Sequence, residues 1–344
     1  MITRSMVDAR GIRELLVQEP RVRQRNHEDL TEVLREYGVL VLTCQQDEDE
    51  LMDAIKAQPQ RIRELWVETI KALKNTGRYV HSAPPLRAAT SALFDGAYPR
   101  EVATSADLVV VGSDVARRVG FEDEGFTASL GGPELVMPDV IRRCMTVRRL
   151  IDLSQSGNFP EGTTRDSIWT EVMAPLAAVS EEATILDRYL LSDLSPSRHL
   201  GGHVPWLLQR LNRAAPRMRY VRLLAGVPRP WNPRTGNRMP IASDELDGIL
   251  REAVRRLMID VTVKVVVAPW GISNEKGPHD RHMRFSCGSA IGVEEGFDRL
   301  NGNRVWGLDG LSWKHLVRPE ALQGLKKRED YVLGHPDRIE LLLP

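Results

Sequence analysis

The chain has 344 residues, with 47 acidic and 47 basic side chains and a hydrophobic content of 42%. This length exceeds that of a usual single hydrophobic core, so we expect two domains. The balanced charge gives no overall attraction to nucleic acid or to a membrane, and the longest apolar runs are too short to span a bilayer. The amino-terminal sequence lacks the apolar segment of a signal peptide, so we expect a cytoplasmic protein without membrane contact.

The cysteines and histidines give no metal or disulfide pattern. Cys44, Cys144 and Cys287 are far apart and odd in number, which argues against a disulfide framework and a cysteine-rich zinc site. The histidine pair in HLGGH (199–203) has a spacing that could bind a metal on a helix, but its two glycines favour a loop. We therefore expect no metal and no cofactor.

The first half of the chain has the pattern of an α/β domain. Residues 1–36 read as helical, and the apolar, β-branched run at 37–43 predicts a buried strand. Residues 44–77 are expected to be helical with a break near Pro59. Residues 105–120 predict a second buried strand that runs into a turn.

Two aspartates flank this second strand. Asp107 and Asp114 raise the possibility of a metal-dependent nuclease, because such enzymes collect Mg²⁺ ligands at strand ends. The 37–43 strand, however, ends in Thr43 and Cys44 and supplies no acid to such a site. We therefore favour a structural role for both aspartates.

The second half has a clearer alternation, and the polar loop at 156–167 separates it from the first. The predicted domains are 1–155 and 165–344. A helix is expected to begin at Ile168. Strands are then expected at 183–193, 218–227 and 261–270, with helices between them at 204–215 and at 243–258, the second capped by Ser243. Further strands are expected at 282–288, 289–293 and 303–308. The order β-α-β-α-β followed by antiparallel strands predicts an α/β domain with a mixed sheet.

Arginines are concentrated in one stretch of the second half. Between Arg198 and Pro240 there is no Asp or Glu, and the nine basic residues are all arginines: 198, 210, 213, 217, 219, 222, 229, 234 and 238. Arginine suits bidentate phosphate contacts, and Trp231 could stack on a base beside Arg229, Arg234 and Arg238. Binding of phosphate or nucleic acid, binding of an acidic protein and a solvated surface all remain open.

The segment GPHDRHMRFSCGSAIGV (277–293) and the strand ILDRYL (185–190) carry a family resemblance. Together with the βαβαβ pattern they resemble one half of the phospholipase D superfamily over roughly residues 180–310. The family motif is H-x-K, an Asp and then a Gly-Ser pair. Its histidine falls on His279 and its lysine on Arg281, whereas its aspartate falls on Ser286. This degenerate "HDR" type is similar to the carboxy-terminal domain of microtubule-interacting-and-trafficking proteins, in which the fold is used for binding.

The resemblance implies a phosphodiester site in which a histidine is nucleophile or general acid and cations bind the phosphate oxygens. His279 and Arg281 are then the catalytic candidates, in a site that a homodimer would complete. The candidate nucleic-acid or phosphate ligands are Arg188, Arg229, Trp231, Arg234, Arg238 and Arg284. Asp187 and Asp280 are expected to form a cross-strand network with their arginine neighbours, which can be purely structural.

Three functions are therefore open. The first is a non-catalytic or weakly catalytic component that binds nucleic acid or a phosphorylated ligand within a bacterial multi-protein system, by analogy antiviral defence. The second is a metal-independent phosphodiesterase or nuclease that acts as a homodimer through His279. The third is a scaffold subunit that binds other proteins.

Overall fold

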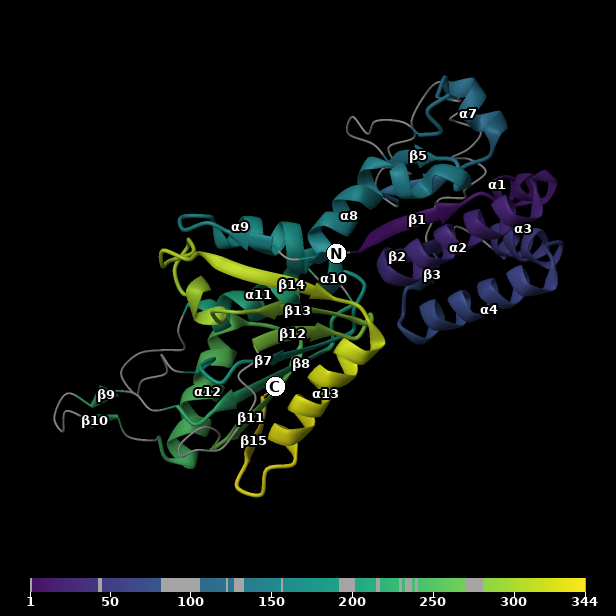
Figure 1. Ribbon diagram of the computed structural model, residues 1–344. Helices are drawn as coiled ribbons and strands as arrows, with labels where there is room; N and C mark the ends of the chain where they lie inside the picture. Colours follow the sequence, from purple (N-terminus) through teal and green to yellow (C-terminus); the bar gives the residue numbers. More distant parts are fainter. Residues whose placement is uncertain are drawn as a thin grey trace. The chain divides into compact units, whose positions relative to one another are not determined.

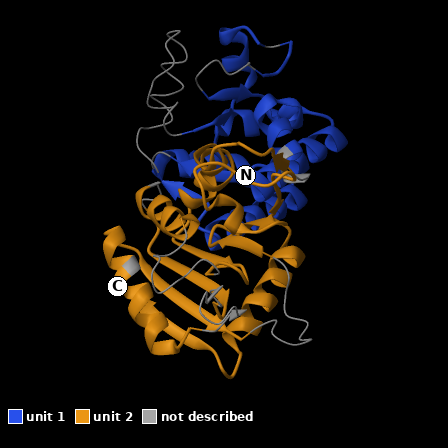
Figure 2. Cartoon of the chain, turned by 90° about the vertical axis from the view of Figure 1, so that its left-hand side faces the viewer, with its two compact units in different colours: residues 1–152 blue, residues 153–344 orange. Residues whose placement is uncertain are grey.

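A computed structural model of the chain forms two compact units, residues 1–152 and 153–344 (Figure 2). The structure describes residues 2–42, 45–81, 106–121, 123–126, 133–155, 157–191, 202–214, 217–228, 231–232, 237–238, 241–269 and 281–343. Within these ranges no helix combines the length and the apolar character needed to cross a membrane.

The first unit is built on a parallel sheet of order β3-β2-β1-β4-β5. Its strands are β1 (Thr3–Val7), β2 (Gly38–Leu42), β3 (Tyr79–His81), β4 (Leu108–Val110) and β5 (Glu134–Val136). The chain first adds strands on one side of β1 and then continues with β4 on the other side. The strand order therefore reverses between β1 and β4, as in doubly wound folds.

Helices of the first unit pack their apolar faces on this sheet. They are α1 (Ala9–Glu14), α2 (Pro20–Tyr37), α3 (Gln45–Lys56), α4 (Gln60–Asn75), α7 (Ser113–Val119) and α8 (Met145–Gln155). The expected break between α3 and α4 is confirmed, since Pro59 is the N-cap residue of α4. One core cluster joins Leu40 of β2 to Leu34 of α2 and Trp66 of α4, and all three are fully buried.

The prediction that residues 1–36 are all helical is wrong at the start, where β1 is the central strand of the sheet. Its sequence TRSMV contains Thr3, Arg4 and Ser5 and lacks the apolar run that marked β2. Arg4 is paired with Asp107, and the parallel partners β2 and β4 make this segment a strand. The turn expected after β4 is helix α7 instead.

The second unit is built on a mixed sheet of order β15-β11-β8-β7-β12-β13-β14-β6. Its strands are β6 (Gly157–Phe159), β7 (Glu182–Leu186), β8 (Tyr220–Gly226), β11 (Thr262–Ala268), β12 (Arg281–Phe285), β13 (Ser289–Val293), β14 (Leu311–Leu316) and β15 (Ile339–Leu343). Strands β7, β8 and β11 are parallel, and the other neighbours pair in antiparallel fashion. The expected α/β class with a mixed sheet is confirmed.

Helices lie on both faces of this sheet. They are α9 (Arg165–Ile168), which continues through one π-helical turn (Trp169–Met173) into α10 (Ala174–Ala177), and α11 (His203–Ala214), α12 (Ser243–Leu257) and α13 (Pro319–Leu333). In Figure 1, α13 crosses one face while α11 and α12 lie behind the strands. Val332 of α13 packs on Leu186, Leu224 and Val266 from three neighbouring strands.

Several local predictions for the second unit are wrong. The strand expected at 183–193 ends at Leu186, and β6 and the start of α9 lie within the loop expected at 156–167. The segment 303–308 forms only an isolated bridge at Arg304, and the next strand is β14. Ser243 is the first residue of α12 rather than its cap, which is Ala242. A separate hairpin pairs β9 (Trp231–Asn232) with β10 (Asn237–Arg238), with Trp231 opposite Arg238.

A buried chain of side chains links three helices of the first unit. The indole N–H of Trp66 donates to Nδ1 of His27 (3.0 Å), because an indole can only donate. Nε2 of His27 therefore carries the proton and donates to Gln58 Oε1 (3.2 Å), and Gln58 Nε2 donates to the carbonyl of Ile12 (2.9 Å). Burial lowers the pKa of His27 to about 4, so the imidazole is neutral at physiological pH.

We predict that His27 stays neutral until the pH approaches 4, which NMR titration of its imidazole measures. Its folded pKa lies below the unfolded value, so its contribution to stability is complete above pH 6.5 and is lost as the pH falls toward 4, by about 3 kcal/mol. Trp66→Phe removes the donor to Nδ1 and is expected to raise the midpoint. A wild-type midpoint near 6.5 would contradict the lowering of the His27 pKa by burial.

Candidate functional site

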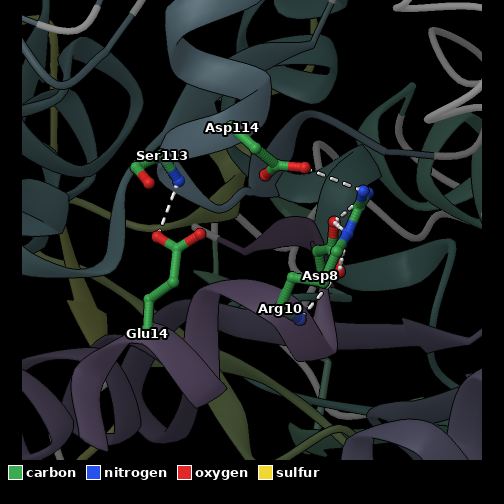
Figure 3. A network of polar contacts seen from close by, with 5 residues as sticks. All are labelled: Asp8, Arg10, Glu14, Ser113 and Asp114. Carbon is green, nitrogen blue, oxygen red and sulfur yellow. Dashed lines mark hydrogen bonds and ion pairs between the residues drawn. The ribbon is translucent and has the colours of Figure 1, made fainter. Parts of the chain in front are cut away.

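Polar side chains gather at the carboxyl ends of parallel strands in both units. In the first unit, Asp8 directly follows β1 and Asp114 lies in the first turn of α7 after β4, at the point where the strand order reverses. Arg10 lies between them and pairs with Asp8 Oδ2 at 2.7 Å and with Asp114 Oδ2 at 3.0 Å (Figure 3). Open α/β sheets bind ligands at such positions.

The same cluster fixes the two helices that follow these strands. Glu14 Oε2 accepts the backbone N–H of Ser113 at 2.7 Å, so a side chain of α1 caps α7 (Figure 3). A Cβ atom at Gly112 would lie 2.7 Å from Glu14 Oε1 and 3.0 Å from Asp114 Oδ1. Glycine, which has no Cβ, therefore leaves space for both carboxylates. The hydrogen bond to Asp8 raises the pKa of Arg10. The cluster therefore joins three carboxylates and one guanidinium group in a polar network at the strand ends.

The aspartates that suggested a metal nuclease do not share a site. Asp107 precedes β4 and pairs with Arg4 at 2.7 Å, whereas Asp114 follows β4 at its other end. Among the residues that the structure describes, no three His, Cys, Asp or Glu side chains are grouped to hold a metal ion. Cys144 and Cys287 are buried thiols without a disulfide, and His203 contacts the carbonyl of Leu190 at 3.1 Å.

In the second unit, one edge of the sheet collects the segments singled out in the sequence. Strands β7, β8 and β11 are parallel, so the loops that follow them leave the same edge. Directly after the three strands, the structure describes residues 187–191, 227–228 and 269 of these connections. Strand β12 begins at this edge, since His282 is paired with Leu186. The chain passes there from one side of β7 to the other, which makes it a switch point of this sheet.

Asp187, the residue after β7, is fully buried and holds this edge together. Its Oδ1 accepts the N–H of Tyr189 at 2.8 Å and its Oδ2 accepts the N–H of Phe297 at 3.0 Å. Arg281 Nε lies 3.6 Å from Oδ1, and Arg281 Nη1 donates to the carbonyl of Glu294 at 2.6 Å. Burial raises the pKa of the Asp187 carboxyl, and these N–H groups and Arg281 oppose that effect.

Two arginines flank one exposed aromatic ring at this edge. Tyr189 is 42% exposed, and the guanidinium carbons of Arg188 and Arg281 lie 5.2 and 5.5 Å from its ring centroid. Both distances are within the range of cation–π attraction. Sequence reasoning selected Arg188 and Arg281 but missed Tyr189, although the quoted strand ILDRYL contains it. We call Arg188, Tyr189 and Arg281 the edge triad.

Arg284, expected to bind phosphate, has a different environment. Its Nε and Nη2 donate to the two oxygens of Glu329 in α13 at 2.8 and 2.5 Å. His282 Nε2 also contacts Glu329 Oε1 at 3.0 Å, and both His282 and Glu329 are buried. Arg284 therefore ties β12 to α13, and we leave it out of the candidate site.

The structure describes no side chain of the remaining predicted site residues. His279, Asp280, Arg229 and Arg234 lie outside the described residues, and Trp231 and Arg238 are described only as backbone of the β9–β10 hairpin. Other arginines of the basic stretch meet acids of their own unit. Arg210 pairs with Asp166 at 2.6 Å, and Arg217 pairs with Glu181 at 2.9 Å.

Residues of the phospholipase D-like motif also have clear structural roles. Ser286, which stands at the family's aspartate position, accepts the N–H groups of Glu181 and Glu182 at 3.0 and 3.2 Å. Gly288 has a φ of 77° in the turn to β13, where Ser289 is buried. No protein-family model and no curated protein matches this chain. The resemblance therefore remains a hypothesis.

We predict that Glu329→Gln lowers the free energy of unfolding by about 3 kcal/mol at pH 7, because it leaves Arg284 without its buried counter-charge. Burial raises the pKa of Glu329, but hydrogen bonds from Arg284 and His282 lower it overall. Its contribution is present above the unfolded pKa of 4.5 and is lost as the pH falls below it.

Denaturant unfolding from pH 7 to pH 3 measures this difference. The control Glu320→Gln changes an exposed carboxylate in the first turn of the same helix. A gap between Glu329→Gln and the wild type that persists unchanged at pH 3 would refute the role of the ionised carboxylate.

Proposed function

We propose that the carboxyl edge of the second unit binds a phosphate-bearing ligand, with nucleic acid as the ligand class, and that the edge triad is the core of the site. The observation that carries this proposal is the placement of two guanidinium groups around one exposed tyrosine ring. Guanidinium groups bind phosphate oxygens in bidentate fashion, and an exposed ring offers a surface for a base.

The electrostatics of the triad favour an anion. Arg188 and Arg281 bring two positive charges, and the carboxylate of the buried Asp187, which pairs with Arg281, also accepts two backbone N–H groups. Arg281 is 21% exposed on its side chain. Arg229, Arg234 and Arg238, which follow β8 in the sequence, are further candidate cations.

A binding role accounts for the triad more simply than catalysis. In the phospholipase D-like alternative, His279 attacks phosphorus and Arg281 replaces the family's lysine. The described polar contacts of Arg281 are to Asp187 and to the Glu294 carbonyl, and they orient the guanidinium beside the Tyr189 ring as a fixed binding group. We therefore propose a binding component of a multi-protein assembly rather than a phosphodiesterase, in a second unit that resembles a degenerate phospholipase D-like domain.

The test is fluorescence anisotropy of labelled oligonucleotides at salt concentrations from 50 to 300 mM. Arg188→Ala is expected to weaken binding to every sequence and to lower the salt slope by about 1. Tyr189→Ala is expected to weaken binding about tenfold. The control Arg255→Ala changes an exposed arginine near the carboxyl end of α12. The chain continues from this end of the helix to the amino end of β11.

Two results would count against this proposal. If the wild-type chain binds no oligonucleotide at 50 mM salt, or if Arg188→Ala and Arg255→Ala weaken binding equally, the edge triad is not the site. Cleavage of a phosphodiester that resists EDTA and is abolished by His279→Ala would favour the enzyme instead.

A further inference from the structure

A second aromatic ring stands on the same edge as the triad. Strand β13 runs parallel to β7, since each is antiparallel to β12, and Val293 at the end of β13 is paired with Arg281. The loop between β13 and β14, residues 294–310, therefore leaves the edge that carries the triad. Within this loop Trp306 is 51% exposed.

Trp306 is held at the surface by specific contacts. Its indole N–H donates to the carbonyl of Asp298 at 3.0 Å, and the guanidinium carbon of Arg299 lies 4.6 Å from the ring centroid. Arg299 Nη1 donates in turn to the carbonyl of Trp306 at 2.8 Å. A large apolar ring that is both fixed and half exposed is a preformed stacking surface, because its ordering cost is already met within the fold.

A glycine makes this arrangement possible. Gly307 has a φ of 99°, and a Cβ atom there would lie 1.4 Å from Arg299 Nη1. Any other residue would displace the guanidinium group from its place beside the tryptophan. The loop therefore combines a positive φ and an absent side chain to keep Arg299 over the ring.

The segment 296–298 connects the two rings. Around Gly296, a Cβ atom would lie 3.2 Å from Asp187 Oδ2, 3.2 Å from Arg281 Cδ and 2.6 Å from Asp298 Oδ1. Gly296 therefore packs closely between Arg281, which contacts the ring of Tyr189, and Asp298, whose carbonyl accepts the indole N–H of Trp306.

The loop has four acids, Glu294, Glu295, Asp298 and Asp309, of which the first two are bound to described partners. Glu294 pairs with Lys314 at 2.6 Å, and Glu295 Oε2 accepts the N–H of Ser312 at 2.8 Å. The guanidinium groups beside the two rings belong to Arg188, Arg281 and Arg299.

We propose that the ligand of this edge is single-stranded nucleic acid, whose bases stack on Tyr189 and Trp306 while their phosphates contact the neighbouring arginines. This inference rests on the proposed function and specifies its ligand. Two exposed rings, each beside a guanidinium group, are the arrangement used by single-strand binders. In a duplex the base faces are stacked on one another and are closed to such rings.

The experiment compares labelled oligothymidine of 2, 4, 8 and 12 nucleotides with a 12-base-pair duplex. We expect the 12-mer single strand to bind at least tenfold more tightly than the duplex, with a logarithmic salt slope of about −2 for three phosphate contacts. Affinity is expected to rise with length until both rings are occupied. Trp306→Ala is expected to weaken the 12-mer about tenfold and Trp306→Phe only slightly.

Matched variants separate this inference from the proposed function on which it rests. Leu308→Ala removes a 94% exposed side chain of the same loop and is expected to change nothing. Single-strand binding that Tyr189→Ala weakens but Trp306→Ala leaves unchanged would overturn the second ring and leave the triad in place. Equal or tighter duplex binding would overturn the single-strand class. No binding of either form would overturn both proposals.

Discussion

The buried carboxylate of Asp187 organises the part of the molecule on which the functional proposal depends. It lies at the end of β7 and accepts N–H groups from Tyr189 and Phe297, which belong to segments far apart in the chain. Burial of an aspartate is costly unless hydrogen bonds and a cation compensate it, and Arg281 supplies the cation. Because these partners are fixed to one carboxylate, the loop before α11, the start of β12 and the loop after β13 are held at a single edge.

The two arginines of the five-residue strand β12 have different roles. Arg281, at its first position, faces the edge and contacts Asp187, whereas Arg284 reaches Glu329 of α13 together with His282. Alternation along a strand sends neighbouring side chains to opposite faces, and the sheet here has helices on both. One arginine therefore remains beside an exposed ring, while the other is used to fix a helix.

Much of the fold could be predicted from the sequence because its core strands are apolar runs and its longer helices have clear periodicity. Strands β2, β8 and β11 and helices α3, α4, α11 and α12 lie close to their predicted positions. Strand β1 could not be predicted, since TRSMV becomes a strand only through its partners on both sides. Asp187, Arg188 and Arg281 were recognisable as polar residues at strand ends, but Tyr189 and Trp306 were not, because their exposure and their arginine neighbours depend on tertiary contacts.

The central claim is that the edge triad contacts nucleic acid, and photocrosslinking tests it most directly. A single-stranded oligonucleotide carrying 5-bromouridine would be irradiated with the full-length protein, and the crosslinked peptides identified by mass spectrometry. The account predicts crosslinks at Tyr189 and at Trp306, both reduced by an excess of unlabelled single strand. Crosslinks confined to the first unit, or to α12 and α13 of the second, would contradict it.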